Sequence, residues 1–169
     1  MITIREYTEN DAEPVGKLIA ETYSRFNLAQ LSPDESKLAL GPFQYAWSDD
    51  QTHKEKIASM IRSEWVFVAV DGDEIVGVIR ARKERLASLF VRDDHHRQGV
   101  ARKLVERFEQ ECQQYAPVVI RLSATVYAVP FYLQMGYKKS TGLRSGWSFD
   151  YHGLPMQPMR KVLKANSLS

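Results

Sequence analysis

The spacing of apolar residues changes abruptly across the polar segment at residues 92–99. Before this segment, three runs typical of strands are separated by short turns and predict an antiparallel meander: residues 65–70, 74–82 and 85–91. After it, apolar residues recur at helical spacing from Val100 to Tyr115. The junction therefore predicts that the last strand of the meander leads through a polar turn into the amino end of a helix.

The other expected elements give a mixed α/β fold of the α+β kind. They are a strand at residues 2–7, helices around residues 15–23, 34–40 and 53–62, a strand at residues 118–123, a short helix at residues 130–136 and a last strand at residues 156–163. Apart from the short helix, residues 24–50 are expected to be irregular, as binding loops often are. Residues 142–153 are expected to form a loop. This order is not the regular alternation of a doubly wound nucleotide-binding sheet.

Length and charge restrict the class of protein. The 169 residues fit one domain, residues 1–169, at about 150 residues per domain. The formal net charge is +2, so neither nucleic acid nor an anionic membrane is expected as a partner. Cys112, the single cysteine, falls on the apolar helix face and is expected to be a buried structural thiol. With no apolar run as long as a membrane span and no signal-peptide pattern, a cytoplasmic protein is the simplest expectation.

The junction before the long helix has the chemistry of an anion site. A helix amino end presents unpaired N–H groups and the positive end of the helix dipole, and Arg97, Arg102 and Lys103 add positive charge. Gly99 would let the backbone approach a phosphate closely, although it would equally serve only to ease the turn. The glycine-rich nucleotide loops G-x-G-x-x-G and G-x-x-x-x-G-K-[ST] are absent from the sequence.

Two segments together resemble the signatures of the GCN5-related N-acetyltransferase (GNAT) superfamily. The segment that resembles its acetyl-coenzyme A motif is Leu89-Phe90-Val91 followed by His96-Arg97-Gln98-Gly99-Val100-Ala101 and Leu104. The second segment is Ala128-Val129-Pro130-Phe131-Tyr132-Leu133-Gln134-Met135-Gly136-Tyr137, and residues 154–161 resemble the closing strand. The resemblance implies a GNAT-type fold, in which a mostly antiparallel sheet splays open between two central parallel strands and is flanked by helices.

This resemblance implies acetyl-CoA as the co-substrate, with no metal ion. The residues at positions implied to contact it are Leu89, Phe90, Val91, His96, Arg97, Gln98, Gly99, Val100, Ala101, Arg102, Thr125 and Tyr132. Of these, the Leu89 amide is implied to stabilise the oxyanion, and Tyr132 to protonate or hydrogen-bond the departing sulfur. The chain departs from the family pattern at His96, where Arg or Gln is usual, and at Thr125, where many members carry Asn.

No general base can be selected from the sequence. The candidates are Glu84, Asp93, Asp94, Asp49 and Asp50, each of which is more simply a solvated charge, and Ser88 is a candidate to orient a water molecule. The run Asp93-Asp94-His95-His96 resembles a metal site, but neighbouring residues in a short loop rarely converge on one ion.

Two groups of residues bear on an acceptor. Arg80 and Arg82 share a strand face and meet either an acidic substrate group or, as the simpler expectation, solvent. Phe43, Tyr45 and Trp47 line an acceptor pocket or pack on the core. The leading hypothesis is an N-acetyltransferase acting on a small-molecule primary amine by direct attack on the thioester. The alternatives are a protein or peptide N-acetyltransferase and a non-catalytic acyl-CoA sensor, and the resemblance also implies a homodimer.

Overall fold

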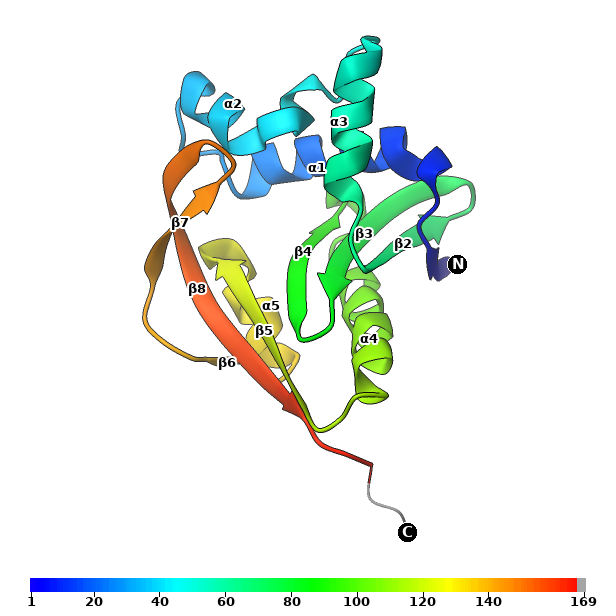
Figure 1. Ribbon diagram of the computed structural model, residues 1–169, viewed down its shortest axis with the longest axis vertical. Coiled ribbons are helices and arrows are strands. Elements are labelled where there is room, and N and C mark those ends of the chain that lie inside the picture. Colours follow the sequence, from blue (N-terminus) through cyan, green and yellow to red (C-terminus); the bar gives the residue numbers. More distant parts are fainter. Residues whose placement is uncertain (167–169) are drawn as a thin grey trace.

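The computed structural model describes residues 1–166 and contains an eight-stranded sheet (Figure 1). The strands are β1 (Ile2–Glu6), β2 (Trp65–Asp71), β3 (Glu74–Arg82), β4 (Arg85–Val91), β5 (Val118–Thr125), β6 (Lys138–Lys139), β7 (Arg144–Ser148) and β8 (Tyr151–Leu163). Their order across the sheet is β1-β2-β3-β4-β5-β8-β6, and β7 pairs with β8 off this path. All pairs are antiparallel except β4 with β5, so the mixed, mostly antiparallel fold expected from the sequence is confirmed.

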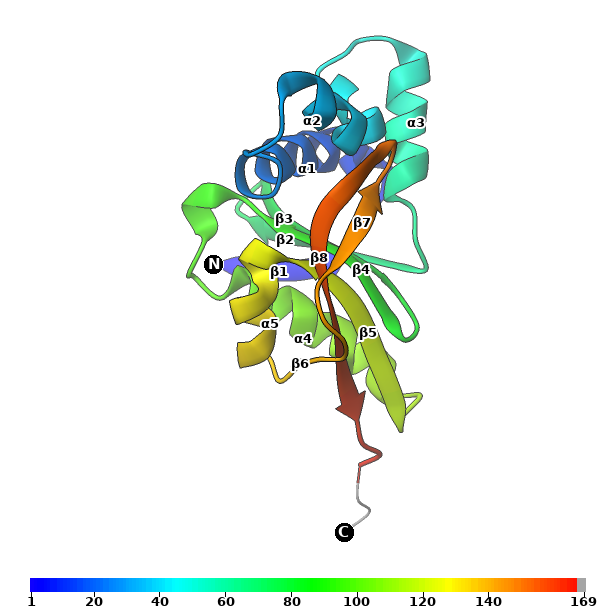
Figure 2. The same cartoon turned by 90° about the vertical axis from the view of Figure 1, so that its left-hand side faces the viewer.

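Helices cover both faces of this sheet. They are α1 (Ala12–Phe26), α2 (Pro33–Leu40), α3 (Gln51–Ile61), α4 (Val100–Gln113) and α5 (Val129–Gln134), with short 3₁₀ turns η1 (Glu9–Asp11), η2 (Gly41–Tyr45), η3 (Asp93–His95) and η4 (Val126–Ala128). Figure 2 shows α1, α2 and α3 on one side of the sheet and α4 and α5 on the other. No helix within residues 1–166 combines the length and apolarity needed to cross a membrane.

The two faces have separate apolar cores. The core under α4 contains Leu104, Phe108 and Cys112, all of them fully buried, which confirms the buried position expected for the cysteine. The core under α1 and α3 contains Val15 and Ile61 from those helices. The core under α4 also contains Ile120 of β5 and Met159 of β8, so it connects the two halves of the sheet on that face.

The sheet opens between β4 and β5. The single aligned pair of these parallel strands is Arg85 with Arg121, and the Arg121 N–H donates to the Glu84 carbonyl at 2.9 Å. Beyond this point the two strands diverge, as Figure 1 shows. The carboxyl ends of β4 and β5 are therefore left without a strand partner on the sides that face each other.

One expectation about the C-terminal region was wrong. Residues 142–153 contain β7 and the start of β8, so they form most of a hairpin and not simply a loop. The irregular features that obscured it are a register shift at Gly146 and Trp147 and a positive φ of 51° at Phe149. This hairpin stands beside α2, and the Asp150 N–H donates to the Leu38 carbonyl at 3.3 Å.

Candidate active site

A cleft of about 980 Å³ occupies the gap between the diverging strands. Its walls come from β4, β5, α1, the amino end of α4, the η4–α5 segment and the β7–β8 hairpin. It is lined by every residue that the family resemblance selected except Gln98: Leu89, Phe90, Val91, His96, Arg97, Gly99, Val100, Ala101, Arg102, Thr125 and Tyr132. The fold thus brings together in one cavity residues separated by more than 40 positions in the chain.

The inner edge of β4 presents to the cleft backbone groups that have no strand partner. The Arg92 N–H donates to the Val76 carbonyl at 2.8 Å, so the even-numbered residues at this end of β4 direct their hydrogen-bonding groups to β3. Because these directions alternate along a strand, the N–H and C=O groups of Leu89 and Val91 point the opposite way, into the gap. An extended ligand with amide groups can therefore pair with this edge as an added strand would.

The amino end of α4 opens into the same cleft. The first bond of the helix runs from the Lys103 N–H to the Gly99 carbonyl at 3.0 Å. The preceding amides of Val100, Ala101 and Arg102 therefore have no acceptor within the helix. Gly99 has a φ of 80°, and a Cβ placed on it would meet nothing within 4 Å. Glycine is favoured at this position because the backbone is left-handed, and the space beside it is open to an anion.

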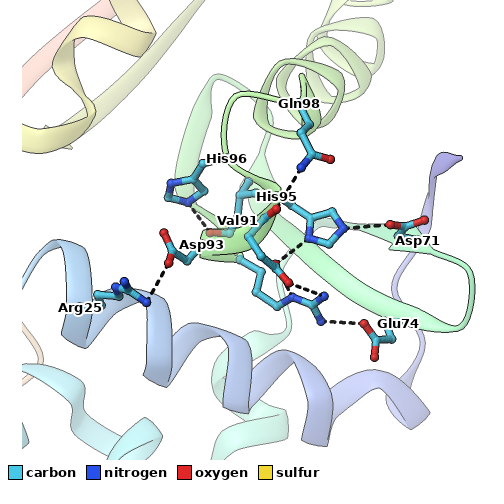
Figure 3. A network of polar contacts seen from close by, with 10 residues as sticks. Arg25, Asp71, Glu74, Val91, Asp93, His95, His96 and Gln98 are labelled. Carbon is cyan, nitrogen blue, oxygen red and sulfur yellow. Dashed lines mark hydrogen bonds and ion pairs between the residues drawn. The ribbon is translucent and has the colours of Figure 1, made fainter.

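The loop between β4 and α4 is fixed by a network of ion pairs, shown in Figure 3. His95 is buried, with its Nδ1 2.7 Å from Asp94 and its Nε2 2.9 Å from Asp71 on β2. Its pKa is raised above the ordinary value, first by the hydrogen bond with Asp71 and then by the one with Asp94. A histidine between two carboxylates donates to both only when it is protonated.

Further ion pairs hold both sides of this loop. Arg92 contacts Asp94 at 2.7 Å and Glu74 at 2.9 Å, and Arg25 of α1 contacts Asp93 at 2.8 Å. The Gln98 side chain turns back to donate to the Asp94 carbonyl at 2.9 Å, which explains why it does not line the cleft. The loop is thereby tied to the β2–β3 hairpin on one side and to α1 on the other (Figure 3).

His96 lies at the end of β4 and lines the cleft. Its Nε2 lies 2.7 Å from the Val91 carbonyl, which can only accept, so Nε2 carries the proton. The imidazole also packs on Phe26, with ring centroids 4.7 Å apart. Phe26 in turn stacks on Tyr127 of η4 at 5.3 Å, so this row of rings spans from the β4 side of the cleft to the β5 side.

Tyr132 of α5 lines the cleft, and its side chain is almost fully buried, with 5% exposed. Burial raises the pKa of its phenol far above the ordinary value of 10. Its ring packs edge-on against Phe131 and Tyr137, with centroids 5.1 and 5.6 Å away. The hydroxyl is therefore held in a fixed place and stays protonated at neutral pH.

None of the carboxylates considered as a general base lines the cleft, and neither does any other Asp or Glu within residues 1–166. Asp93 and Asp94 are occupied by the ion pairs of the loop. Asp50 caps α3 by accepting the Thr52 N–H at 2.8 Å, and Glu84 sits in the β3–β4 turn with a φ of 69°. Asp49 is exposed. Within residues 1–166, the cavity therefore offers no carboxylate to accept a proton from a ligand.

The three aromatic side chains of η2 and its neighbourhood do not act together. Phe43 is buried and lines the cleft. Tyr45 instead stacks on His53 with centroids 3.9 Å apart, and Trp47 is exposed outside the cleft. The alternation in sequence suggested a shared face, but the chain here is helical, so residues two apart point in different directions.

The β7–β8 hairpin adds side chains that sequence reasoning missed. Trp147, Ser148 and Phe149 all line the cleft. The Ser148 hydroxyl donates to the Ala39 carbonyl at 2.7 Å and accepts from the Tyr23 hydroxyl at 2.5 Å, which fixes the hairpin to α2 and α1. The concentration of aromatic residues between 147 and 151 was the available signal.

Arg80 lines the cleft, whereas Arg82 is exposed and does not. The other charged residues of the lining belong to the loop before α4 or to its first turn. Within residues 1–166, no group of three or more His, Cys, Asp or Glu side chains is arranged to hold a metal ion.

A sequence profile described as an acetyltransferase (GNAT) domain matches residues 27–163. The chain belongs to the GNAT acetyltransferase family. Members of this family carry out acetyl-CoA-dependent acetyl transfer. Comparison with curated protein sequences found no match.

Solved structures share the fold of this GNAT chain at low sequence identity. A GCN5-related N-acetyltransferase from Rhodopseudomonas palustris is 17% identical with a TM-score of 0.78, and 95% of each chain is covered. The PaiA N-acetyltransferase from Thermoplasma acidophilum, solved in complex with coenzyme A, is 17% identical with a TM-score of 0.67 over 96% of this chain and 99% of the other. The ribosomal-protein-S18-alanine N-acetyltransferase from Escherichia coli is 16% identical with a TM-score of 0.64 over 99% and 97%.

Proposed function

We propose that this chain transfers the acetyl group of acetyl-CoA to the primary amine of a small molecule. The observation that carries the proposal is the cleft itself. Its β4 edge has no strand partner beyond Arg85, the amino end of α4 opens into it, and Tyr132 lines it. These features fit the parts of the co-substrate, which has a pyrophosphate, an amide-bearing arm and a thioester.

The amides of Val100, Ala101 and Arg102 would bind the pyrophosphate, since they lack acceptors and lie at the positive end of α4. The free edge at Leu89 and Val91 would pair with the amide-bearing arm. His96 already donates to the Val91 carbonyl, so its ring would shift if the arm used that oxygen. Thr125 would contact the arm from the β5 side.

Acetyl-CoA supplies the acetyl group as a thioester, so the amine nitrogen bonds to the acetyl carbon while the carbon–sulfur bond breaks, and the amine loses a proton as the sulfur gains one. The Leu89 N–H would stabilise the negative charge that develops on the carbonyl oxygen. The Tyr132 hydroxyl would donate a hydrogen bond to the sulfur. Because no Asp or Glu of residues 1–166 lines the cleft, the amine proton would pass to water.

A small acceptor is favoured by the way the α1–α3 side of the cleft is enclosed. Phe149 of the β7–β8 hairpin lies so close to Gly41 that a Cβ there would come within 2.4 Å of its ring. The Phe149 and Phe43 rings are 6.1 Å apart. Because the hairpin packs on η2 in this way, this side of the cleft leaves little room for a folded protein as the acceptor.

The proposal is tested by measuring coenzyme A binding and acetyl transfer separately. At about 100 times the dissociation constant, coenzyme A should stabilise the protein by about 2.7 kcal/mol. Release of thiol from acetyl-CoA should depend on an added amine, and mass spectrometry should find the acetylated amine. Binding without transfer to any amine or peptide would indicate a sensor, and transfer to peptides alone would overturn the small-molecule assignment.

A further inference from the structure

Arg80 brings a positive charge into the cleft from the side of the sheet opposite α4, whose amino end is the proposed pyrophosphate site. The other arginines that line the cavity, Arg97 and Arg102, lie at the α4 end where the pyrophosphate would bind. Arg80 projects from β3 on the face covered by α1 and α3, the face that also carries Val78 and Phe90. Its charge would therefore be available to a part of the acceptor.

The hydrogen bonds of Arg80 leave part of its guanidinium free. Its Nε donates to the Ile61 carbonyl at 3.0 Å, one Nη to the Met60 carbonyl at 2.6 Å and the other Nη to the Ser88 hydroxyl at 3.3 Å. A guanidinium has five N–H groups, so three are used and each Nη retains one. No Asp or Glu within residues 1–166 forms an ion pair with Arg80.

The position of Arg80 is close to the proposed reaction centre. In the β3–β4 ladder Arg80 is opposite Ser88, the residue before Leu89. One Nη of Arg80 lies 3.3 Å from the Ser88 hydroxyl, so a group bound by both would lie beside the residue that precedes Leu89. The amine and an anionic group of one small molecule can span the separation between that group and the Leu89 amide.

The charges in this part of the cleft favour an acceptor that carries a negative charge. Burial lowers the pKa of Arg80 because desolvation penalises its charged form, and the carbonyls that accept its hydrogen bonds at the end of α3 carry no full negative charge. No carboxylate of residues 1–166 lines the cavity to bind a second ammonium group. A polycationic acceptor would thus meet an arginine with no counter-charge, whereas an anionic acceptor would neutralise it.

We propose that the acceptor is a small amine that also carries a carboxylate near the amine, as an amino acid does, and that Arg80 with Ser88 binds that carboxylate. This inference rests on the proposed acetyl transfer. The two free N–H groups on adjacent terminal nitrogens suit the two oxygens of a carboxylate. A phosphate would bring more charge than this single arginine neutralises. Phe43, Phe90 and Phe149 provide an apolar wall for the rest of the acceptor.

The first test compares matched acceptors with the wild-type protein. Apolar amino acids are assayed beside their methyl esters and their decarboxylated amines, so that only the carboxylate differs. We expect kcat/KM to be at least about tenfold higher for the amino acid, because a site with unpaired polar groups rejects an analogue that lacks the partner. Equal or better use of the decarboxylated amines or of amines carrying a phosphate would overturn the proposal.

The second test uses Arg80→Gln and Arg80→Lys, with Arg82→Gln as the matched control on the same strand. Arg80→Gln should raise KM for the amino acid and leave the esters unchanged, and Arg80→Lys should restore part of the preference. Arg82→Gln should change neither, because that side chain is exposed outside the cleft. If Arg80 served only to hold the end of α3, its loss would affect all acceptors alike.

Calorimetry of amino acid binding to the protein saturated with coenzyme A gives a readout independent of turnover. Binding should be detected in the wild type and lost in Arg80→Gln, while the thermal shift by coenzyme A persists in both. If acetyl transfer occurs equally well to amines with and without a carboxylate, the role of Arg80 is refuted but the proposed function is not. Absence of coenzyme A binding in the wild type would instead refute the proposed function.

Discussion

The side-chain amide of Asn27 donates a hydrogen bond of 2.6 Å to the hydroxyl of Thr125. Asn27 directly follows the last residue of α1, and Thr125 is the last residue of β5. The bond therefore joins a helix over the β1–β4 half of the sheet to the strand that diverges from it. It crosses the opening at the place where the two halves have no backbone contact.

Replacing Thr125 with Val should weaken this connection. The variant keeps the shape of the side chain but removes the acceptor, so we expect a loss of about 1 kcal/mol in the free energy of unfolding. For a chain of this size that corresponds to a melting temperature about 2–4 °C lower. Chemical denaturation measures the change.

Thr125→Ser is the matched control, because it retains the hydroxyl and should lose little stability. A double-mutant cycle with Asn27→Ala isolates the interaction between the two side chains. If the effects of Thr125→Val and Asn27→Ala simply add, the bond contributes nothing to stability and the two halves are held by other contacts.

Local patterns predicted most of this fold, because the residues that each element buries against the rest of the protein recur along it with a regular pattern. β2 and β3 are continuous apolar runs because both faces of the sheet are covered there, and α4 buries one face at helical spacing. The β7–β8 hairpin was missed because Gly146, the shift beside Trp147 and the left-handed Phe149 interrupt the alternation. Its anchor, Ser148 between Tyr23 and Ala39, joins residues more than 100 positions apart and leaves no local pattern.

The candidate site divides in the same way. The α4 end could be predicted because the glycine, the helix and the strand are consecutive in the chain. The acceptor side could not, because the hydrogen bonds of Arg80 to Met60 and Ile61 depend on where α3 ends against the sheet. Likewise, the ion pairs that occupy Asp93 and Asp94 involve partners on α1 and next to β4, so the sequence left both as candidate bases.

Gly99→Ala should separate backbone strain from coenzyme binding. Gly99 has a φ of 80° with open space around it, so alanine would cost about 1 kcal/mol of stability through strain alone. Its methyl group would also enter the space beside the free amides of α4 and weaken coenzyme A binding. Thermal melts and calorimetric titration with coenzyme A measure the two effects.

Gly72→Ala is the control for that substitution. Gly72 has a φ of 61° and equally open space, but it lies in the β2–β3 turn outside the cleft. It should lose similar stability with unchanged coenzyme A affinity. Equal losses of affinity in both variants would mean that the α4 end does not bind the coenzyme.

The position of His95 between Asp71 and Asp94 predicts a pH-dependent stability. Its pKa is raised in the folded protein, so the stabilisation is complete below the unfolded value of about 6.5 and is lost as the pH rises through the folded pKa. The difference in free energy of unfolding between wild type and His95→Gln should therefore shrink between pH 6 and pH 9. The variant keeps the contact of the Met1 amino group with Asp71 and the contact of Arg92 with Asp94, so the difference isolates the histidine. A constant or growing difference would contradict a raised pKa of His95 in the folded protein.

Tyr132→Phe should lower turnover while leaving coenzyme A affinity nearly unchanged. The ring would still fill its place against Phe131 and Tyr137, and only the hydroxyl would be lost. We expect kcat to fall by about 100-fold if that hydroxyl donates to the departing sulfur. Because burial raises the pKa of Tyr132 above 10, the wild-type kcat should show no decline from its ionisation up to about pH 10. Tyr127→Phe, which alters another cleft-lining tyrosine, serves as the control and should retain turnover. A normal kcat in Tyr132→Phe, or an equal fall of kcat in Tyr127→Phe, would contradict a specific role of the Tyr132 hydroxyl at the sulfur.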